Sequence, residues 1–129
     1  MKNRVAVLGA SPNRERYSNQ AVRMLIDEGY EVLPINPGQR QIEGIAAYPR
    51  LAAVEGPVHT VSVYVSPKHA CTYEADIVAL NPPRVIFNPG AEYPPLMAKL
   101  SEQGVEVLAA CTLVMLRTGQ FTPNTRQGE

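Results

Sequence analysis

Short, valine-rich apolar runs alternate along the chain with longer stretches in which apolar residues recur every three or four positions. The short runs are typical of strands buried on both faces of a sheet: residues 4–9 (RVAVLG), 31–36 (EVLPIN), 58–65, 84–88 (RVIFN) and 105–109. The longer stretches predict helices over residues 19–28, 50–54, 68–80 and 94–103. Gly29 and Gly104 supply C-terminal stops for two of these helices.

This alternation of strand and helix predicts an α/β fold, a Rossmann-like open parallel sheet of about five strands with helices on both faces. The crossovers between parallel strands should be right-handed. Residues 39–47 are predicted to form a loop, and residues 113–116 continue an apolar stretch after the last strand. We expect residues 1–121 to form one domain and residues 122–129 a polar C-terminal tail.

Composition narrows the class of protein. The chain has 129 residues, 45% hydrophobic and 19% charged, which predicts one folded domain and excludes a disordered chain. Twelve basic residues balance twelve acidic ones, which argues against nucleic acid or an anionic membrane as partner. No apolar run approaches the roughly 20 residues of a membrane span. Two distant cysteines, Cys71 and Cys111, favour a reduced, cytoplasmic setting.

In an open parallel sheet the ligand binds outside the carboxyl ends of the strands, where the strand order reverses. The predicted strand ends are small, stiff loops that let a ligand approach the backbone closely. These loops are Gly9-Ala10-Ser11, Asn36-Pro37-Gly38, Val65-Ser66-Pro67 and Asn88-Pro89-Gly90.

The first loop differs from the dinucleotide fingerprint GxGxxG. Only Gly9 is present, because Ser11 and Arg14 occupy the second and third glycine positions. The acidic residue that bonds the ribose of NAD is also missing, since the neutral Asn36 stands at the end of the second strand. A neutral amide does not repel a phosphorylated ribose. The sequence therefore favours a phosphorylated ribose or another nucleotide over NAD.

Several polar residues near these loops suit an anion. Ser11 offers a hydroxyl and an N–H near a predicted helix start, and Arg14 and Arg16 carry positive charge. Alternatively, Ser11 or Ser18 caps the helix and the arginines are solvated.

Basic residues at two further loops leave similar alternatives open. Lys68 and His69 fall in the first turn of a predicted helix, where a cation is unfavourable unless an anion binds. Otherwise both are ordinary surface residues, as is Arg40 unless it reaches a phosphate.

No catalytic group and no metal site are predicted. Cys71 is interpreted as a small packing residue inside a helix, whereas Cys111 follows the fifth strand and borders the carboxyl edge. A catalytic thiol needs an activating base, but His59 opens the third strand at the opposite edge and His69 has no evident partner. The carboxylates are scattered over loops and helix faces.

Four loop motifs, in order, resemble those of the CoA-binding domain family. They are VAVLGAS, VLPINPG, VYVSP and FNPGAE, and the similarity runs from about Arg4 to Leu116. The family is a stand-alone relative of the CoA-binding domain of the succinyl-CoA synthetase alpha subunit. One departure is that Gln39, followed by Arg40, stands where the synthetase-like pattern has lysine.

The resemblance implies that coenzyme A binds across the carboxyl edge of the sheet. Its phosphates would meet Gly9, Ala10 and Ser11, and its adenosine end would meet Asn36 and Pro37. The middle of the ligand would contact Val65, Ser66 and Pro67, and the pantetheine arm would approach Pro89 and Gly90. Arg14, Arg40 and Lys68 complete the candidate binding residues. The synthetase carries its phosphorylated histidine on a further domain, so ligase activity is not expected here.

Three hypotheses follow. The first is a binding module for coenzyme A or an acyl-CoA, without a catalytic constellation and with an unknown protein partner. The second is an NAD(P)-binding redox or sensor domain. The third is an interaction subunit that has lost its ligand.

Overall fold

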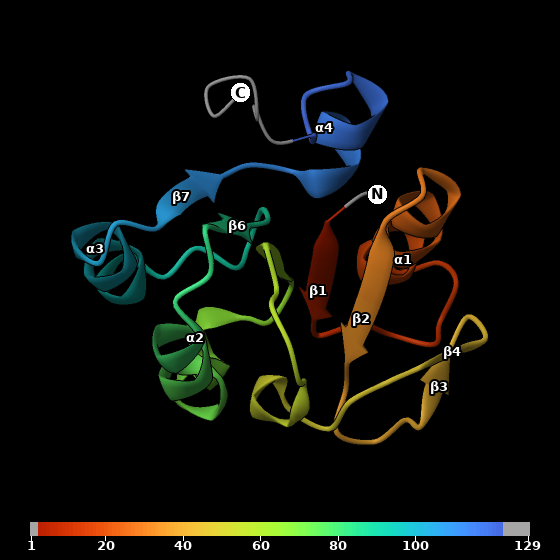
Figure 1. The fold of residues 1–129 in the computed structure, drawn as a ribbon, viewed down its shortest axis with the longest axis horizontal. Coiled ribbons are helices and arrows are strands. Elements are labelled where there is room, and N and C mark those ends of the chain that lie inside the picture. The colour runs from red at the N-terminus through yellow and green to blue at the C-terminus, as the bar shows by residue number, and fades with distance from the viewer. Residues whose placement is uncertain (1–2, 123–129) are drawn as a thin grey trace.

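A computed structural model describes residues 3–122, and its centre is a five-stranded parallel sheet (Figure 1). The strand order is β2-β1-β5-β6-β7, and every neighbouring pair is parallel. The strands are β1 (Arg4–Leu8), β2 (Glu31–Ile35), β5 (Thr60–Val63), β6 (Arg84–Phe87) and β7 (Glu106–Ala109). Taken in chain order, this is the 2-1-3-4-5 arrangement of a doubly wound sheet.

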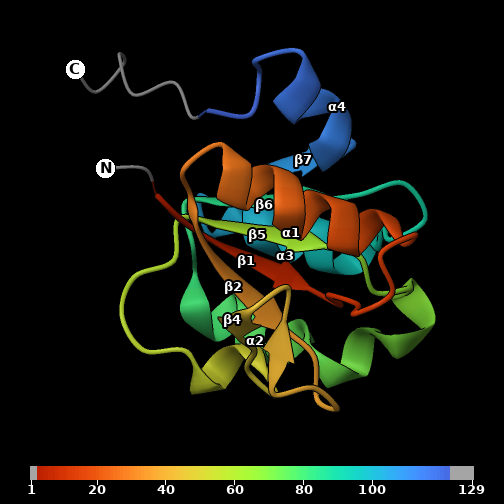
Figure 2. The same cartoon turned by 90° about the vertical axis from the view of Figure 1, so that its right-hand side faces the viewer.

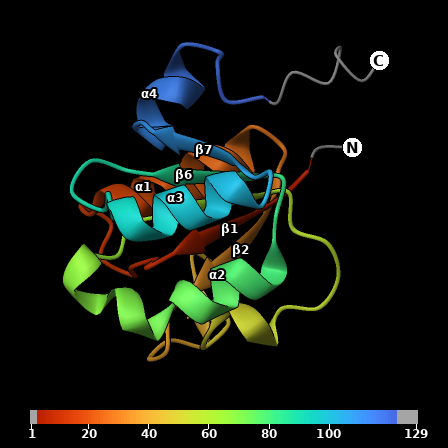
Figure 3. The same ribbon diagram turned by 90° about the vertical axis from the view of Figure 1, so that its left-hand side faces the viewer.

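Helices cover both faces of the sheet, as predicted. Figure 2 shows α1 (Tyr17–Asp27) and α4 (Thr112–Arg117) on one side of it. On the other side lie α2 (Glu74–Leu80) and α3 (Pro94–Glu102), which run across the front of Figure 3. The short 3-10 helices η1 (Leu51–Ala53) and η2 (Pro67–Thr72) pack near α2.

Two hydrophobic cores, one on each face of the sheet, explain why β1 has four apolar residues in succession. Successive side chains of a strand point to opposite faces, so Val5 and Val7 pack with α1 and α4, whereas Ala6 and Leu8 pack with α2 and α3. All four are buried. Pro34 is tolerated inside β2 because β2 is an edge strand of this sheet. On the outer side of an edge strand, the missing N–H of a proline removes no hydrogen bond to a neighbouring strand of the sheet.

The predicted loop at residues 39–47 contains a small antiparallel hairpin, β3 (Gln41–Ile42) and β4 (Ile45–Ala46). Its turn residues, Glu43 and Gly44, both have positive φ, at 53° and 80°. Ile42 is buried in the core beneath α1. Strands of two residues are too short to show the alternation from which strands are predicted.

The helix predicted over 68–80 is also different, because it is split in two. His69 has non-helical dihedrals inside η2, and α2 begins only at Glu74. Cys71 is consequently exposed, and its interpretation as a packing residue is wrong.

Two further differences concern short elements. The expected helix at 50–54 is the single turn η1, and the apolar stretch 113–116 is helical, forming α4. Of the predicted tail at 122–129, only Thr122 belongs to the described residues, and residues 123–129 lie outside them. No helix among residues 3–122 is long and apolar enough to cross a membrane.

Candidate functional site

The strand order reverses between β1 and β5. The chain leaves β1 toward α1 on one face of the sheet, and it leaves β5 toward η2 and α2 on the other. The two connections diverge at the carboxyl ends of these strands, and such a divergence opens a crevice in doubly wound folds.

Gly9 lies at this point and cannot be replaced without displacing its neighbours. Its φ is +88°, and a Cβ on it would lie 2.9 Å from Val65 Cγ2 and 3.4 Å from the carbonyl carbon of Tyr64. The backbone of the loop after β1 therefore passes against the loop after β5. Gly9 lines two separate cavities, one on each side of this contact.

The first cavity lies toward α1 and has a volume of about 440 Å³. Its lining is half polar and half apolar and includes several hydroxyl and charged side chains: Gly9, Ser11, Glu15, Arg16, Tyr17, Ser18 and Tyr64. No side chain caps α1, whose N-cap residue is Arg16. The first-turn amides of a helix carry partial positive charge and need acceptors, so this cavity has the character of an anion site.

Tyr64 forms one wall of the first cavity and follows β5 directly. Burial raises the pKa of Tyr64 to about 12, against smaller opposing effects of the nearby Thr112 and Ser62 hydroxyls. Its own hydroxyl is buried without a hydrogen bond of regular geometry among the described residues. Tyr64 is therefore neutral at physiological pH and adds no negative charge to the cavity.

The second cavity lies on the opposite side of Gly9, has a volume of about 460 Å³ and is largely apolar. It is lined by Leu8, Gly9, Ile35, Pro37, Pro49, Arg50, Leu51, Val65, His69, Thr72, Tyr73 and Asp76. An apolar wall with a few polar groups is typical of a site for an organic ring or chain.

A charged pair closes one side of the second cavity. Arg50 donates two hydrogen bonds to Asp76, at 3.1 and 2.7 Å, and the Ala52 N–H donates a third at 3.2 Å. The Arg50 guanidinium lowers the pKa of Asp76, while the carboxylate raises the pKa of Arg50. The pair holds the segment around η1 against α2 and leaves Asp76 ionised above acidic pH.

Asn36 holds two of the predicted loops together. Its Nδ2 donates to the Ala10 carbonyl at 2.7 Å, and its Oδ1 accepts from the Gly38 N–H at 2.7 Å. The N–H groups of Gly9 and Ala10 also donate to the Ile35 carbonyl. The side-chain amide of Asn36 thus fixes the loops after β1 and β2 relative to each other.

Asn88 has a comparable structural role below the loop after β6. It is buried and donates to Ser62 Oγ and the Val63 carbonyl, both at 2.9 Å. Its Oδ1 accepts from the Thr112 N–H at 2.8 Å. The amide therefore joins the ends of β5 and β6 to the start of α4.

The structure brings together part of the predicted set of binding residues. Gly9, Ser11, Pro37 and Val65 line the two cavities, and Arg16, weighed beside them, lines the first. The binding role of each is still a prediction.

The remaining members of the set lie elsewhere. Ser66 Oγ accepts from the Lys68 N–H at 3.5 Å and caps η2. Arg14 lines a separate hollow, where it pairs with Glu43. Other residues do not line either cavity: Ala10, Asn36, Arg40, Pro67, Lys68, Pro89 and Gly90.

Sequence reasoning missed Tyr64, Tyr73 and the Arg50–Asp76 pair. Tyr64 stands inside the VYVSP motif, so its position at a strand end was available as a signal. Arg50 and Asp76 are 26 positions apart, and nothing in the sequence links them.

The two histidines lie at opposite edges of the sheet, with His69 on the wall of the second cavity. His59 lies at the amino end of β5 with its Nδ1 2.8 Å from Thr60 Oγ1, and burial lowers the pKa of His59. Among residues 3–122, no group of three or more His, Cys, Asp or Glu side chains is placed to hold a metal ion.

Comparison with known proteins connects this geometry to a family. The family model described as a CoA binding domain matches residues 3–117. The uncharacterized protein YneT of Bacillus subtilis is 34% identical over 61 residues, which are 47% of this chain and 45% of that protein. The matched segment thus spans less than half the length of that relative.

Solved structures share the fold. A crystal structure of an uncharacterized protein has a TM-score of 0.86 and 36% identity, covering 94% of this chain and 99% of that one. A dinucleotide-forming acetyl-coenzyme A synthetase from Ca. Korarchaeum cryptofilum, in complex with phosphate and ADP, has a TM-score of 0.73. The sequence identity is 21%, and the match covers 84% of this chain and 25% of the synthetase. The likeness therefore concerns the fold alone.

Proposed function

The chain belongs to the CoA-binding domain family, and from this premise we propose that it binds coenzyme A or an acyl-CoA across the carboxyl ends of β1, β2 and β5. The observation that carries the proposal is the pair of cavities that share Gly9. One has polar and charged side chains on its wall and adjoins a helix start, and the other is largely apolar. Coenzyme A has the same division, with a charged diphosphate joined to an adenine ring.

The diphosphate is assigned to the first cavity. The uncapped first turn of α1, the Ser11 hydroxyl and the Arg16 guanidinium supply donors and positive charge there, and anions bind at such helix starts. Tyr64 is neutral and adds no repulsion. Glu15 also lines this cavity, so we expect a phosphate to lie on the Arg16 side.

The adenosine end is assigned to the second cavity. Pro37 and Val65 lie on its wall, and the neutral Asn36 beside Pro37 leaves room for the 3′-phosphate of coenzyme A. Arg40 is exposed two residues beyond Gly38 and is the nearest cation in sequence for that phosphate. The remaining strand-end residues would follow the pantetheine arm toward the loop after β6.

The protein acts, in this proposal, as a binding module and not as a catalyst. Within residues 3–122 no hydrogen bond joins Cys111 or Cys71 to a base that would activate a thiol, and the charged pair beside the second cavity is already satisfied within the fold. Binding of an acyl-CoA would then present the thioester to a partner.

Calorimetry with coenzyme A, dephospho-CoA, NADPH, NAD and ATP tests the proposal. We expect coenzyme A to bind most tightly, and dephospho-CoA about tenfold more weakly, since one charge-assisted hydrogen bond is worth about that factor. Preferential binding of NADPH would replace this function by a redox or sensor function. Absence of binding by all five compounds would leave an interaction subunit without ligand.

A matched pair of variants locates the site. R16Q removes the cation of the first cavity and should weaken coenzyme A about tenfold. R117Q removes an exposed arginine near the end of α4, far along the chain from either cavity, and should bind as the wild type does. Equal affinities of the two variants would contradict the assignment of the diphosphate to the first cavity.

A further inference from the structure

The loop between β1 and α1, residues 11–16, is internally held only by short turns. Ser11 Oγ accepts from the Asn13 N–H, and Asn13 Oδ1 accepts from the Glu15 N–H, both at 3.0 Å. The loop is exposed from Pro12 through Arg16. Local turns of this kind leave a loop mobile unless other elements hold it. Its position beside the first cavity therefore depends on contacts from the rest of the fold.

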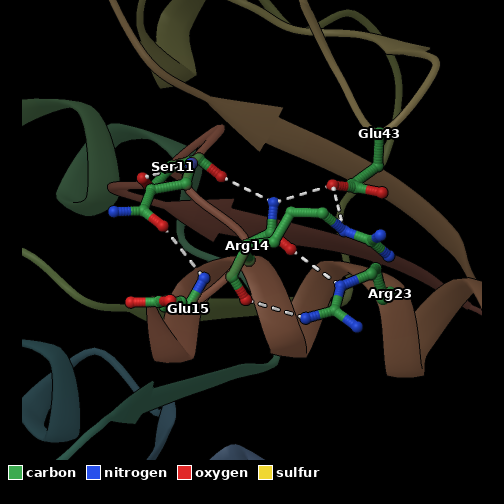
Figure 4. Close-up of polar contacts among 7 residues, drawn as sticks. Ser11, Arg14, Glu15, Arg23 and Glu43 are labelled. Carbon is green, nitrogen blue, oxygen red and sulfur yellow. Dashed lines mark hydrogen bonds and ion pairs between the residues drawn. The ribbon is translucent and has the colours of Figure 1, made fainter.

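Asn19, in the first turns of α1, provides the inner contact. It is completely buried, and its Nδ2 donates to the Ser11 carbonyl at 2.9 Å and to Glu43 Oε2 at 3.0 Å. Its Oδ1 accepts from Arg23 Nε at 2.8 Å, and Arg23 in turn donates to the Arg14 carbonyl at 2.9 Å. Figure 4 shows how these bonds converge between the loop and the helix.

Glu43, at the tip of the β3–β4 hairpin, provides the outer contact. Its Oε2 accepts from Asn19 and also lies 3.4 Å from Arg14 Nε (Figure 4). The side chain is only 20% exposed. One carboxylate oxygen thus joins the hairpin, the helix and the loop.

The backbone of Glu43 argues that this side chain is needed. Its φ of +53° lies in the left-handed region, where glycine or asparagine is favoured and a longer side chain is strained. A glycine there would make the turn easily, as Gly44 does at φ +80°. Strain retained at one position marks a residue whose side chain serves another purpose.

We propose that Glu43 is a positioning residue for anion recognition, which holds loop 11–16 beside the first cavity through Asn19 and Arg14. The proposal rests on the function proposed above. The same contact draws Arg14 toward the hairpin, into a hollow with Arg23 and Asp27. The first cavity is thereby left with Arg16 as its cation among the described residues, and the ligand specificity depends on the hairpin although no hairpin residue lines the cavity.

The variant E43G tests this role without damaging the turn. Glycine relieves the backbone strain, so a loss of function would follow from the missing side chain and not from a distorted turn. We expect amide protons of residues 13–16 to exchange about tenfold faster with solvent, and coenzyme A to bind about tenfold more weakly, since the side-chain contacts to both Asn19 and Arg14 are lost. E43Q retains an oxygen that accepts from Asn19 but loses the charge opposite Arg14. Its exchange and affinity should lie between those of E43G and wild type, within about threefold of wild type.

E102Q is the matched control, because Glu102 ends α3, is exposed and makes no ion pair within residues 3–122. It removes the same charge and should leave both measurements unchanged. Thermal melting confirms that each variant is folded at the temperature of the assay.

The possible outcomes separate the two proposals. Unchanged amide exchange in E43G overturns the positioning role, whether or not the protein binds coenzyme A. Faster exchange with unchanged affinity overturns the link between the loop and anion recognition. If the wild type does not bind coenzyme A while E43G exchanges faster, the proposed ligand is wrong and Glu43 still positions the loop. Weakened binding in E43G that E43Q restores supports both proposals.

Discussion

Replacing Gly9 by alanine tests whether the contact between the loops after β1 and β5 shapes the binding site. The added Cβ would lie 2.9 Å from Val65 Cγ2, closer than carbon atoms approach in folded proteins, on a backbone with φ of +88°. The matched variant is G104A. Gly104 has nearly the same dihedral, +90°, but nothing lies within 4 Å of its added Cβ, and it stands between α3 and β7, at the amino end of the sheet.

The expected loss of unfolding free energy has two parts. The left-handed conformation destabilises an alanine by about 1–2 kcal/mol, and this loss applies to both variants. Overpacking against Val65 costs a further 1–3 kcal/mol or so, and only G9A bears it. We therefore expect G104A to lose about 1–2 kcal/mol of unfolding free energy and G9A about 2–5 kcal/mol.

Urea denaturation measures these differences, and melting temperatures should follow at roughly 3–6 °C per kcal/mol. Calorimetry with coenzyme A supplies the functional comparison. G104A should bind as the wild type does, whereas G9A narrows both cavities and should bind at least about tenfold more weakly. A G9A protein as stable as G104A, with wild-type affinity, would refute the argument that this close approach shapes the site.

Three further predictions concern stability. N88A leaves the Thr112 N–H and the Ser62 hydroxyl without the Asn88 amide, and urea denaturation should show a loss of about 2–4 kcal/mol; a loss below 1 kcal/mol or so would contradict the network. Since Arg50 lowers the pKa of Asp76, the ionised pair stabilises the fold above the unfolded pKa and this stability is lost as pH falls through the folded pKa. Melting curves should therefore show that wild type loses more stability than D76N between about pH 5 and pH 3. Equal losses in the two proteins would contradict a stabilising role of the ionised pair. R84M removes the buried Arg84 guanidinium, whose Nε donates to Thr60 Oγ1 at 3.0 Å and which lies over the Phe121 ring. Calorimetric melting should show a loss of about 1–3 kcal/mol, because this hydrogen bond and the cation–π contact are lost, and an unchanged melting temperature would contradict this expectation.

The strands β1, β2, β5 and β6 were predictable because each is buried on both faces, whereas β7 is a partly exposed edge strand. A continuous apolar run such as RVAVL that recurs between helical stretches is typical of a buried parallel strand. The structure confirms the parallel sheet and its two helical layers. The strand-end rule likewise placed Gly9 and Val65 at one edge, where they are in contact.

The missed features depend on contacts between distant segments. The β3–β4 hairpin has only two residues per strand, and its position is set by Ile42 packing under α1 and by Glu43 reaching Asn19. From the place of Arg14 in the chain, a phosphate contact and a solvated side chain were both open, and the structure pairs it with Glu43, 29 residues later. Periodicity carries no information about such pairs.

The thin wall that Gly9 forms between the two cavities has a consequence for chemical probes. Two small fragments, one anionic and one aromatic, should occupy the two hollows independently and weakly. A molecule that carries both groups on a short tether over Gly9 then binds its second half intramolecularly, at an effective concentration in the millimolar range for a short flexible tether. Ligand discovery on this protein can therefore proceed by fragment linking, with a tether that runs over the partly exposed Gly9 and not between the two loops.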